Sequence, residues 1–190
     1  KAGDWLTLDQ MQQMIDQIDT ATLRGRRDKA IIAIFFGCGL RRGEVCQLTW
    51  GQLTQYDDVH VIKNLERKHG RMQDYVPVPD WVMQTIEAYQ PRGKDNEKVF
   101  SSIDKHGHLR GAITGDALRK IVVSYANKLG FGMIGPHDLR RTAARQLKQA
   151  GVDISQIQQL LGHSSADVTA KYINETMDLE GLATAVKLNI

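Results

Sequence analysis

The sequence predicts a mainly α-helical domain that carries one small antiparallel β-sheet. Apolar residues recur with helical spacing over most of the 190 residues. Several of these segments begin at a capping residue and end at glycine, as helices do. The central stretch 59–78 is instead rich in β-branched and aromatic residues, with a turn in its middle. With 42% hydrophobic and 25% charged residues, the chain can bury a core without crosslinks.

The first part of the chain is expected to form three helices. Thr7 and Gln10 make a capping box that opens the first of them. A second helix is predicted from about residue 24 through a buried stretch to residue 36, where glycines end it. A short third helix is predicted at residues 41–48.

The pattern then changes to strands before helical spacing returns. Residues 59–65 and 74–78 are predicted to be two strands, joined by a hairpin turn at Lys68-His69-Gly70-Arg71. The polar stretches 91–97 and 106–111 are expected to be loose connections. Further helices are predicted at residues 80–89, 114–129, 137–150, 153–161, 165–172 and 179–187.

The net charge and the cysteine content exclude few classes of protein. A formal net charge of +3 does not by itself identify a nucleic-acid-binding protein. Cys38 and Cys46 lie on apolar helical patterns, which indicates small buried residues in a reducing compartment and no disulfide. No apolar stretch is long enough to cross a membrane, and the N-terminus lacks the pattern of a signal peptide. We therefore expect a cytoplasmic protein with no membrane partner. Because the initiator Met is missing, we also expect the sequence to be a fragment of a longer chain.

Two arginines stand at helix starts, where they can address a small anion. Arg41, within Gly39-Leu40-Arg41-Arg42-Gly43-Glu44, lies where one predicted helix stops and the next begins. Glu44 lies on the same helix face and is expected to fix the fork of its guanidinium. His137 and Arg140 are three residues apart at the start of another helix, so they share a face. A capping imidazole and a surface arginine are the structural alternative for this second pair.

A second imidazole and a phenol follow near the C-terminus. His163 comes directly after Gly162, which can supply the left-handed turn that closes a helix. Tyr172 lies on a short polar helix, where tyrosines usually serve packing. At an unperturbed pKa near 10, about one phenol in a thousand is ionised at neutral pH, so a nucleophilic role requires a base and a positive site. Two imidazoles, two guanidiniums and a phenol together suit metal-free attack on a phosphodiester.

In this order and on these elements, the motifs resemble the catalytic domain of tyrosine recombinases of the phage integrase family. The resemblance runs from about residue 6 to residue 173. It implies that residues 1–190 form one catalytic domain, with a core at about 6–173 and a tail helix within 174–190. It also implies that the family's N-terminal DNA-binding domain is absent from this fragment. The matching segments are residues 39–44, Lys68, residues 137–140, and residues 161–172.

The resemblance implies how the phosphate would be attacked. Tyr172 would attack the scissile phosphate, giving a 3′-phosphotyrosyl link and a free 5′-hydroxyl. Arg41 and Arg140 would hold the non-bridging oxygens and stabilise the five-coordinate transition state. His163 would donate a further hydrogen bond to the same oxyanion.

The resemblance also implies the two proton transfers. His137 would accept the proton of Tyr172 or assist its transfer, and Lys68 would protonate the departing 5′-oxygen. The connection from Lys68 to Pro77 is about one residue longer than the family pattern, so Lys63 is a rival for the second role. We favour Lys68, since a hairpin tip can enter the minor-groove side of the cleavage site, whereas Lys63 would lie in the middle of a strand.

The activity implied is site-specific recombination of double-stranded DNA, with no metal, ATP or other cofactor. We expect a homo-tetramer on two DNA sites, a monomer in isolation, and accessory DNA-bending proteins as further partners. The tail helix is expected to pack either on its own domain or on a neighbouring protomer.

Three other functions fit parts of the sequence. A type IB topoisomerase uses a closely similar set of groups, but Leu161-Gly162-His163 and the length of the tail favour a recombinase. A catalytically silent DNA-binding module is disfavoured because each catalytic role has a candidate. A metal hydrolase built from His106, His108, His137 and His163 is disfavoured, because no cysteine or carboxylate lies near His106 and His108 at ligand spacing.

Overall fold

The computed structural model describes residues 5–67, 71–90, 92–162 and 177–190. Lys68, His163, Tyr172 and the helix predicted at residues 165–172 therefore lie outside the described residues.

The helices predicted within the described residues are all present. The first one has the predicted capping box, in which the Thr7 hydroxyl accepts the Gln10 N–H at 3.2 Å and the Gln10 side chain accepts the Thr7 N–H at 2.9 Å. The helices are α1 (Leu8–Asp16), α2 (Leu23–Cys38), α3 (Arg42–Gln47), a 3₁₀ turn at Trp50–Gln52, α4 (Asp80–Tyr89), α5 (Gly115–Lys128), α6 (Pro136–Gln149), α7 (Ile154–Leu161) and α9 (Leu179–Thr184).

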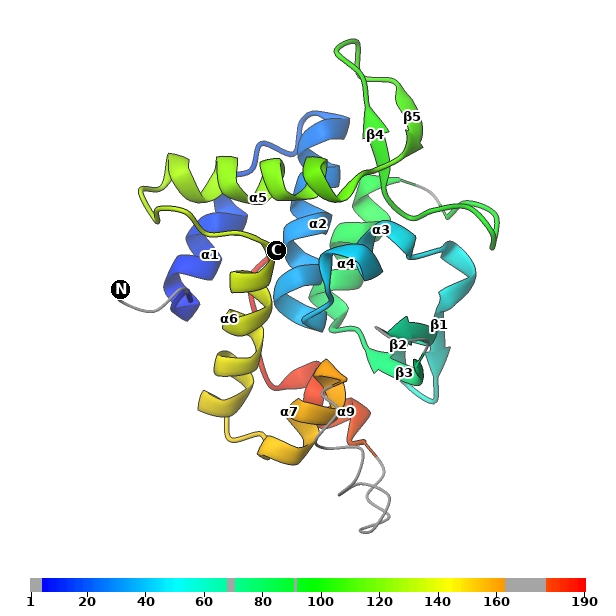
Figure 1. The fold of residues 1–190 in the computed structure, drawn as a ribbon, viewed down its shortest axis with the longest axis vertical. Helices are drawn as coiled ribbons and strands as arrows, with labels where there is room; N and C mark the ends of the chain where they lie inside the picture. Colours follow the sequence, from blue (N-terminus) through cyan, green and yellow to red (C-terminus); the bar gives the residue numbers. More distant parts are fainter. Residues whose placement is uncertain (1–4, 68–70, 91, 163–176) are drawn as a thin grey trace.

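The predicted hairpin is part of a three-stranded antiparallel sheet. Its strands β2 (Val59–Arg67) and β3 (Arg71–Pro77) pair along their length, and β1 (Leu53–Tyr56) adds to the other edge of β2. A second sheet pairs β4 (Ser101–Ile103) with β5 (Leu109–Ala112) and projects away from the helices (Figure 1). The prediction that residues 106–111 form only a loose connection was therefore wrong. The side chains of β5 are all exposed, so no alternation of apolar and polar residues marked this strand.

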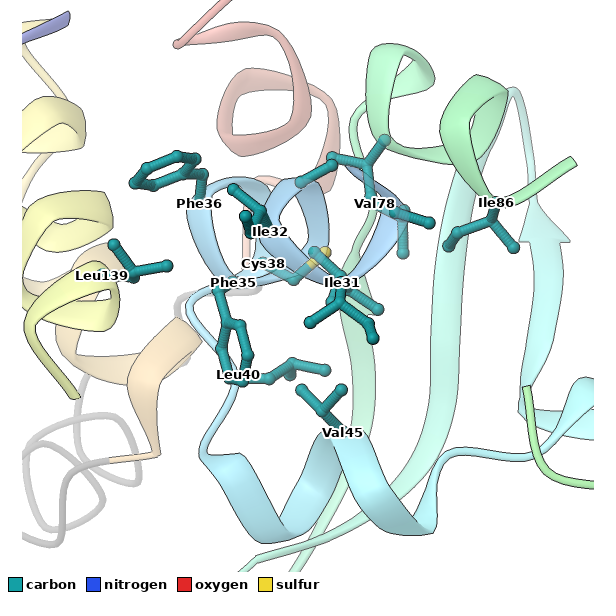
Figure 2. Close-up of a cluster of buried hydrophobic side chains, with 14 of the residues drawn as sticks. Ile31, Ile32, Phe35, Phe36, Cys38, Leu40, Val45, Val78, Ile86 and Leu139 are labelled. Carbon is teal, nitrogen blue, oxygen red and sulfur yellow. The ribbon is translucent and has the colours of Figure 1, made fainter. Parts of the chain in front are cut away.

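Helix α2 is the centre of the core. Most of its residues from Ala30 to Cys38 are fully buried, and α1, α4, α5 and α6 pack around it (Figure 1). Figure 2 shows Phe35, Leu40 and Val45 filling the space between α2 and α3. The helix ends at Gly39, whose left-handed φ of 57° turns the chain sharply so that Leu40 is buried and Arg41 comes out at the edge of the core.

The sequence predictions for the two cysteines are confirmed in part. Cys38 and Cys46 are both buried and both free thiols. Burial raises the pKa of the Cys38 thiol, so it stays protonated and serves as a small apolar side chain.

Within the described part of the chain, no helix is both long and apolar enough to span a membrane.

The described tail packs on its own domain. Leu182 and Leu188 are buried, and α9 contacts β2 and β3. The indole Nε1 of Trp81, in α4, donates to the Val186 carbonyl at 3.1 Å. Helix α9 ends at Thr184 and not at residue 187 as predicted, and the Val186 carbonyl accepts its bond from Trp81 instead.

Candidate active site

Arg41 is fixed at the junction between α2 and α3. Its backbone is extended, and its N–H donates to Glu44 Oε2 at 2.7 Å. Its guanidinium Nη1 donates to Glu44 Oε1 at 2.9 Å, which confirms the prediction that Glu44 fixes this fork. The Arg41 side chain is 32% exposed, so the rest of the fork remains accessible to a ligand.

Arg140 reaches the same place from α6. It is only 5% exposed, and its Nη1 donates to the Gly39 carbonyl at 2.6 Å while Nη2 donates to the Leu161 carbonyl. Burial lowers the pKa of Arg140 to about 10, helped by the charges of Arg41 and Arg67. The side chain therefore still carries its positive charge at neutral pH.

A third arginine, Arg67, which we did not predict as a site residue, bonds both Glu44 and the end of α7. It is the last residue of β2 and is 4% exposed. Its Nη1 donates to Glu44 Oε2 at 2.6 Å, Nη2 to the Leu160 carbonyl at 2.6 Å and Nε to Gln73 Oε1 at 2.8 Å. Burial lowers the pKa of Arg67, and the Glu44 carboxylate opposes this effect. The sequence does hold one signal, because Arg67 follows Leu65 by two residues and so points to the buried face of the strand.

Three guanidiniums thus cap the C-terminus of α7. The carbonyls of Leu160, Leu161 and Gly162 accept from Arg67, Arg140 and Arg41 respectively, the last at 3.4 Å. The last carbonyls of a helix lack helical partners and carry partial negative charge, so cations bind there favourably. Arg41 and Arg140, distant in the sequence, are consequently held around one point.

A cavity of about 540 Å³ opens beside this point. Arg41, His137 and Arg140 line it, together with Arg42 and Arg119. His137 is exposed at the first turn of α6, so its imidazole is accessible from the cavity. Among the described residues that line the cavity, Asp138 is the one carboxylate, and it accepts the Gly135 N–H at 2.9 Å. The walls of the cavity are therefore strongly positive, as a phosphate site requires.

The structure places the remaining predicted residues as follows. Lys68 and His163 are outside the described residues, but the segments that lead to them meet, since a Cβ added at Gly162 would lie 3.2 Å from Arg67 Nε. Lys63 is exposed in the middle of β2, opposite Tyr75, as predicted for that position.

Of the four histidines of the alternative metal site, His163 lies outside the described residues, and the rings of His106 and His108 lie 6.3 Å apart. His106 and His108 lie on the β4–β5 connection, where both backbone N–H groups donate to Asp104. Across the described ranges there is no group of three side chains that can ligate a metal.

The family model described as the phage integrase family matches residues 4–178. The chain belongs to this family. It is 28% identical over 174 residues to tyrosine recombinase XerA of Pyrococcus horikoshii, covering 90% of this chain and 56% of that protein. It is 31% identical over 174 residues to tyrosine recombinase XerD of Neisseria meningitidis, covering 88% of this chain and 57% of that protein. The chain thus spans little more than half the length of these curated relatives.

Solved structures share the fold. The crystal structure of XerA recombinase superposes with a TM-score of 0.67 at 20% identity, over 93% of this chain and 60% of that one. XerH site-specific recombinase, in a pre-cleavage complex with its difH substrate, superposes with a TM-score of 0.68 at 23% identity, over 97% of this chain and 54% of that one. The predicted fold class, mainly α with small antiparallel sheets, and the predicted family are both confirmed.

Proposed function

We propose that this chain is the catalytic domain of a site-specific recombinase that cuts and rejoins double-stranded DNA through a 3′-phosphotyrosyl intermediate. The observation that carries the proposal is the convergence of Arg41 and Arg140, both bonded to the end of α7, on one positive cavity. Relatives of this chain are named tyrosine recombinases, and XerH site-specific recombinase was solved bound to its difH substrate.

The chemistry follows from the charges that develop on the phosphate. Attack by the Tyr172 oxygen forms a P–O bond and places negative charge on the non-bridging oxygens of a five-coordinate phosphorus. Arg41 and Arg140 stabilise that charge, and because carbonyls already hold their guanidiniums, little reorganisation is needed. His163 adds a third donor to the same oxygens.

Proton transfer completes the step. His137, accessible from the cavity, takes the proton of Tyr172 or assists its transfer. The P–O5′ bond breaks, and Lys68 gives a proton to the leaving 5′-oxygen, with Lys63 as the rival donor. The phosphotyrosyl link keeps the bond energy, so a 5′-hydroxyl from another strand can reverse the step without ATP, metal or another cofactor.

The proposal includes the domain bounds, the oligomeric state and the cellular location. We propose a core at residues 6–173 with a C-terminal tail, a homo-tetramer on two DNA sites during strand exchange, and a monomer without DNA. Accessory DNA-bending proteins are further partners. Since the proposed substrate is DNA, we place the protein in the cytoplasm, either at the bacterial nucleoid or encoded by a phage or mobile element.

A nicked duplex that traps the cut strand tests the proposal. The chain is incubated with a library of such duplexes, and DNA-linked protein is isolated under denaturing conditions and mapped by mass spectrometry. We expect the adduct on Tyr172, undiminished in chelator, and no adduct with Tyr172→Phe although DNA binding persists. An adduct in the Phe variant removes Tyr172 from the role, and relaxation of supercoiled DNA without sequence preference identifies a type IB topoisomerase instead.

A further inference from the structure

The Glu44 carboxylate accepts hydrogen bonds from the guanidiniums of two arginines, Arg41 and Arg67. Glu44 is 7% exposed. Its Oε1 accepts from the Arg41 guanidinium, while Oε2 accepts from the Arg67 guanidinium and from the Arg41 backbone N–H. Arg67 therefore uses one side of the carboxylate and leaves the Arg41 fork with a single side-chain bond to Glu44.

The loss of Arg67 would change where Arg41 points. A buried carboxylate that loses one cation needs another, and Arg41 is the guanidinium already bonded to it. Because arginine binds a carboxylate best through two parallel bonds, the Arg41 fork would turn toward Glu44 and away from the cavity. The Leu160 carbonyl would lose its donor at the same time.

We infer that Arg67 is a positioning residue for the phosphate site, which acts by holding Glu44 and the end of α7 so that Arg41 faces the cavity. This inference rests on the proposed function. It assigns to a strand residue outside the recognised motifs the task of orienting a catalytic arginine. Arg67 also joins the turn end of the β2–β3 hairpin to α7, the helix that precedes His163.

The chain offers a matched control in Arg27. Arg27 is also 4% exposed and bonds a buried carboxylate, that of Asp28, at 2.7 Å. It lies near the start of α2, whereas the site is at the other end, about 18 Å away at 1.5 Å per residue. Arg27→Met therefore breaks an equally buried ion pair without touching the cavity.

The first experiment separates catalysis from binding. DNA affinity and single-turnover cleavage of a saturating nicked duplex are measured below the unfolding temperature of every variant. Arg67→Met should slow cleavage about tenfold while the Kd for DNA changes less than about threefold, because only the transition-state contact is disturbed. Arg67→Lys, which keeps the charge, should recover part of the loss, and Arg27→Met should cleave at the wild-type rate. Wild-type cleavage by Arg67→Met, or an equal loss in Arg27→Met, overturns the inference.

A second experiment tests whether Arg67 acts through Glu44. In a Glu44→Gln background the carboxylate no longer competes for Arg41, so Arg67→Met should then slow cleavage by less than about threefold. Multiplicative losses in the double variant contradict the inference.

A third measurement does not depend on DNA cleavage. The Nε–H resonance of Arg41, assigned through its disappearance in Arg41→Lys, should shift in Arg67→Met and stay in place in Arg27→Met. An unmoved resonance overturns the inference. If the wild-type chain forms no adduct at all, the proposed function fails, and this resonance still decides the role of Arg67.

Discussion

Gly162→Ala is expected to weaken both folding and DNA cleavage. Gly162 has a φ of 60° at the end of α7, a conformation that costs an L-residue about 1–2 kcal/mol. An alanine Cβ there would also lie 3.2 Å from Arg67 Nε and 3.3 Å from its Cδ. Arg67 is held by three bonds, so it can yield only by loosening one of them, at a cost of about 1–2 kcal/mol more. The free energy of unfolding should therefore fall by about 2–4 kcal/mol in total.

Gly130→Ala separates the two contributions. Gly130 has a φ of 72°, and a Cβ added there meets nothing within 4 Å. This variant should lose only the backbone contribution of about 1–2 kcal/mol and should cleave DNA at the wild-type rate. Urea unfolding gives the free energies, and trapping on a nicked duplex gives the cleavage rates. Equal destabilisation of the two variants, or normal cleavage by Gly162→Ala, refutes the reasoning that the α7 end and Arg67 are tightly packed.

Two further predictions concern the elements beside the site. Asp153 caps α7 by accepting the Ser155 N–H at 2.7 Å, and hydrogen bonds from the Ser155 side chain and backbone lower the pKa of its carboxyl. Asp153→Ala should lower the unfolding free energy at pH 7. The charged cap stabilises above the unfolded pKa, and its contribution is lost as the pH falls through the lower folded pKa, so the difference between the two proteins should shrink in acid; a constant difference contradicts this role. Leu182→Ala should cost about 2–4 kcal/mol, because Leu182 is buried in the body of the domain; a change within error means that the tail leaves the domain in solution.

The elements that sequence alone predicted are those with strong local signals. Helix α4 occupies the predicted residues, since Pro79 sets its start and apolar residues recur along one face. The capping box at Thr7 and the glycine at the end of α2 likewise act within a few residues of themselves. Strands β1, β4 and β5 were missed because they are three or four residues long and depend on partners elsewhere in the chain.

At the site, too, local contacts were predictable from sequence and long-range contacts were not. Glu44 was predicted to fix Arg41 because both groups lie on one turn of helix. The bonds from Arg140 to Gly39 and Leu161 join segments far apart in the sequence, and no local pattern encodes them. Arg67 was missed because it belongs to no motif and its role depends on where α7 ends.

The end of α7 is the physical centre of this site. Phosphate chemistry needs several cations close together, yet cations repel one another, and burial makes that repulsion stronger. Here the repulsion is offset by Glu44 and by three successive carbonyls, each held by a different arginine. The arrangement gathers three positive charges, and under the proposed function a phosphate that enters the cavity meets Arg41 and Arg140 already in place. It also implies that a change which displaces the backbone at Leu160, Leu161 or Gly162 displaces the arginines bonded to it.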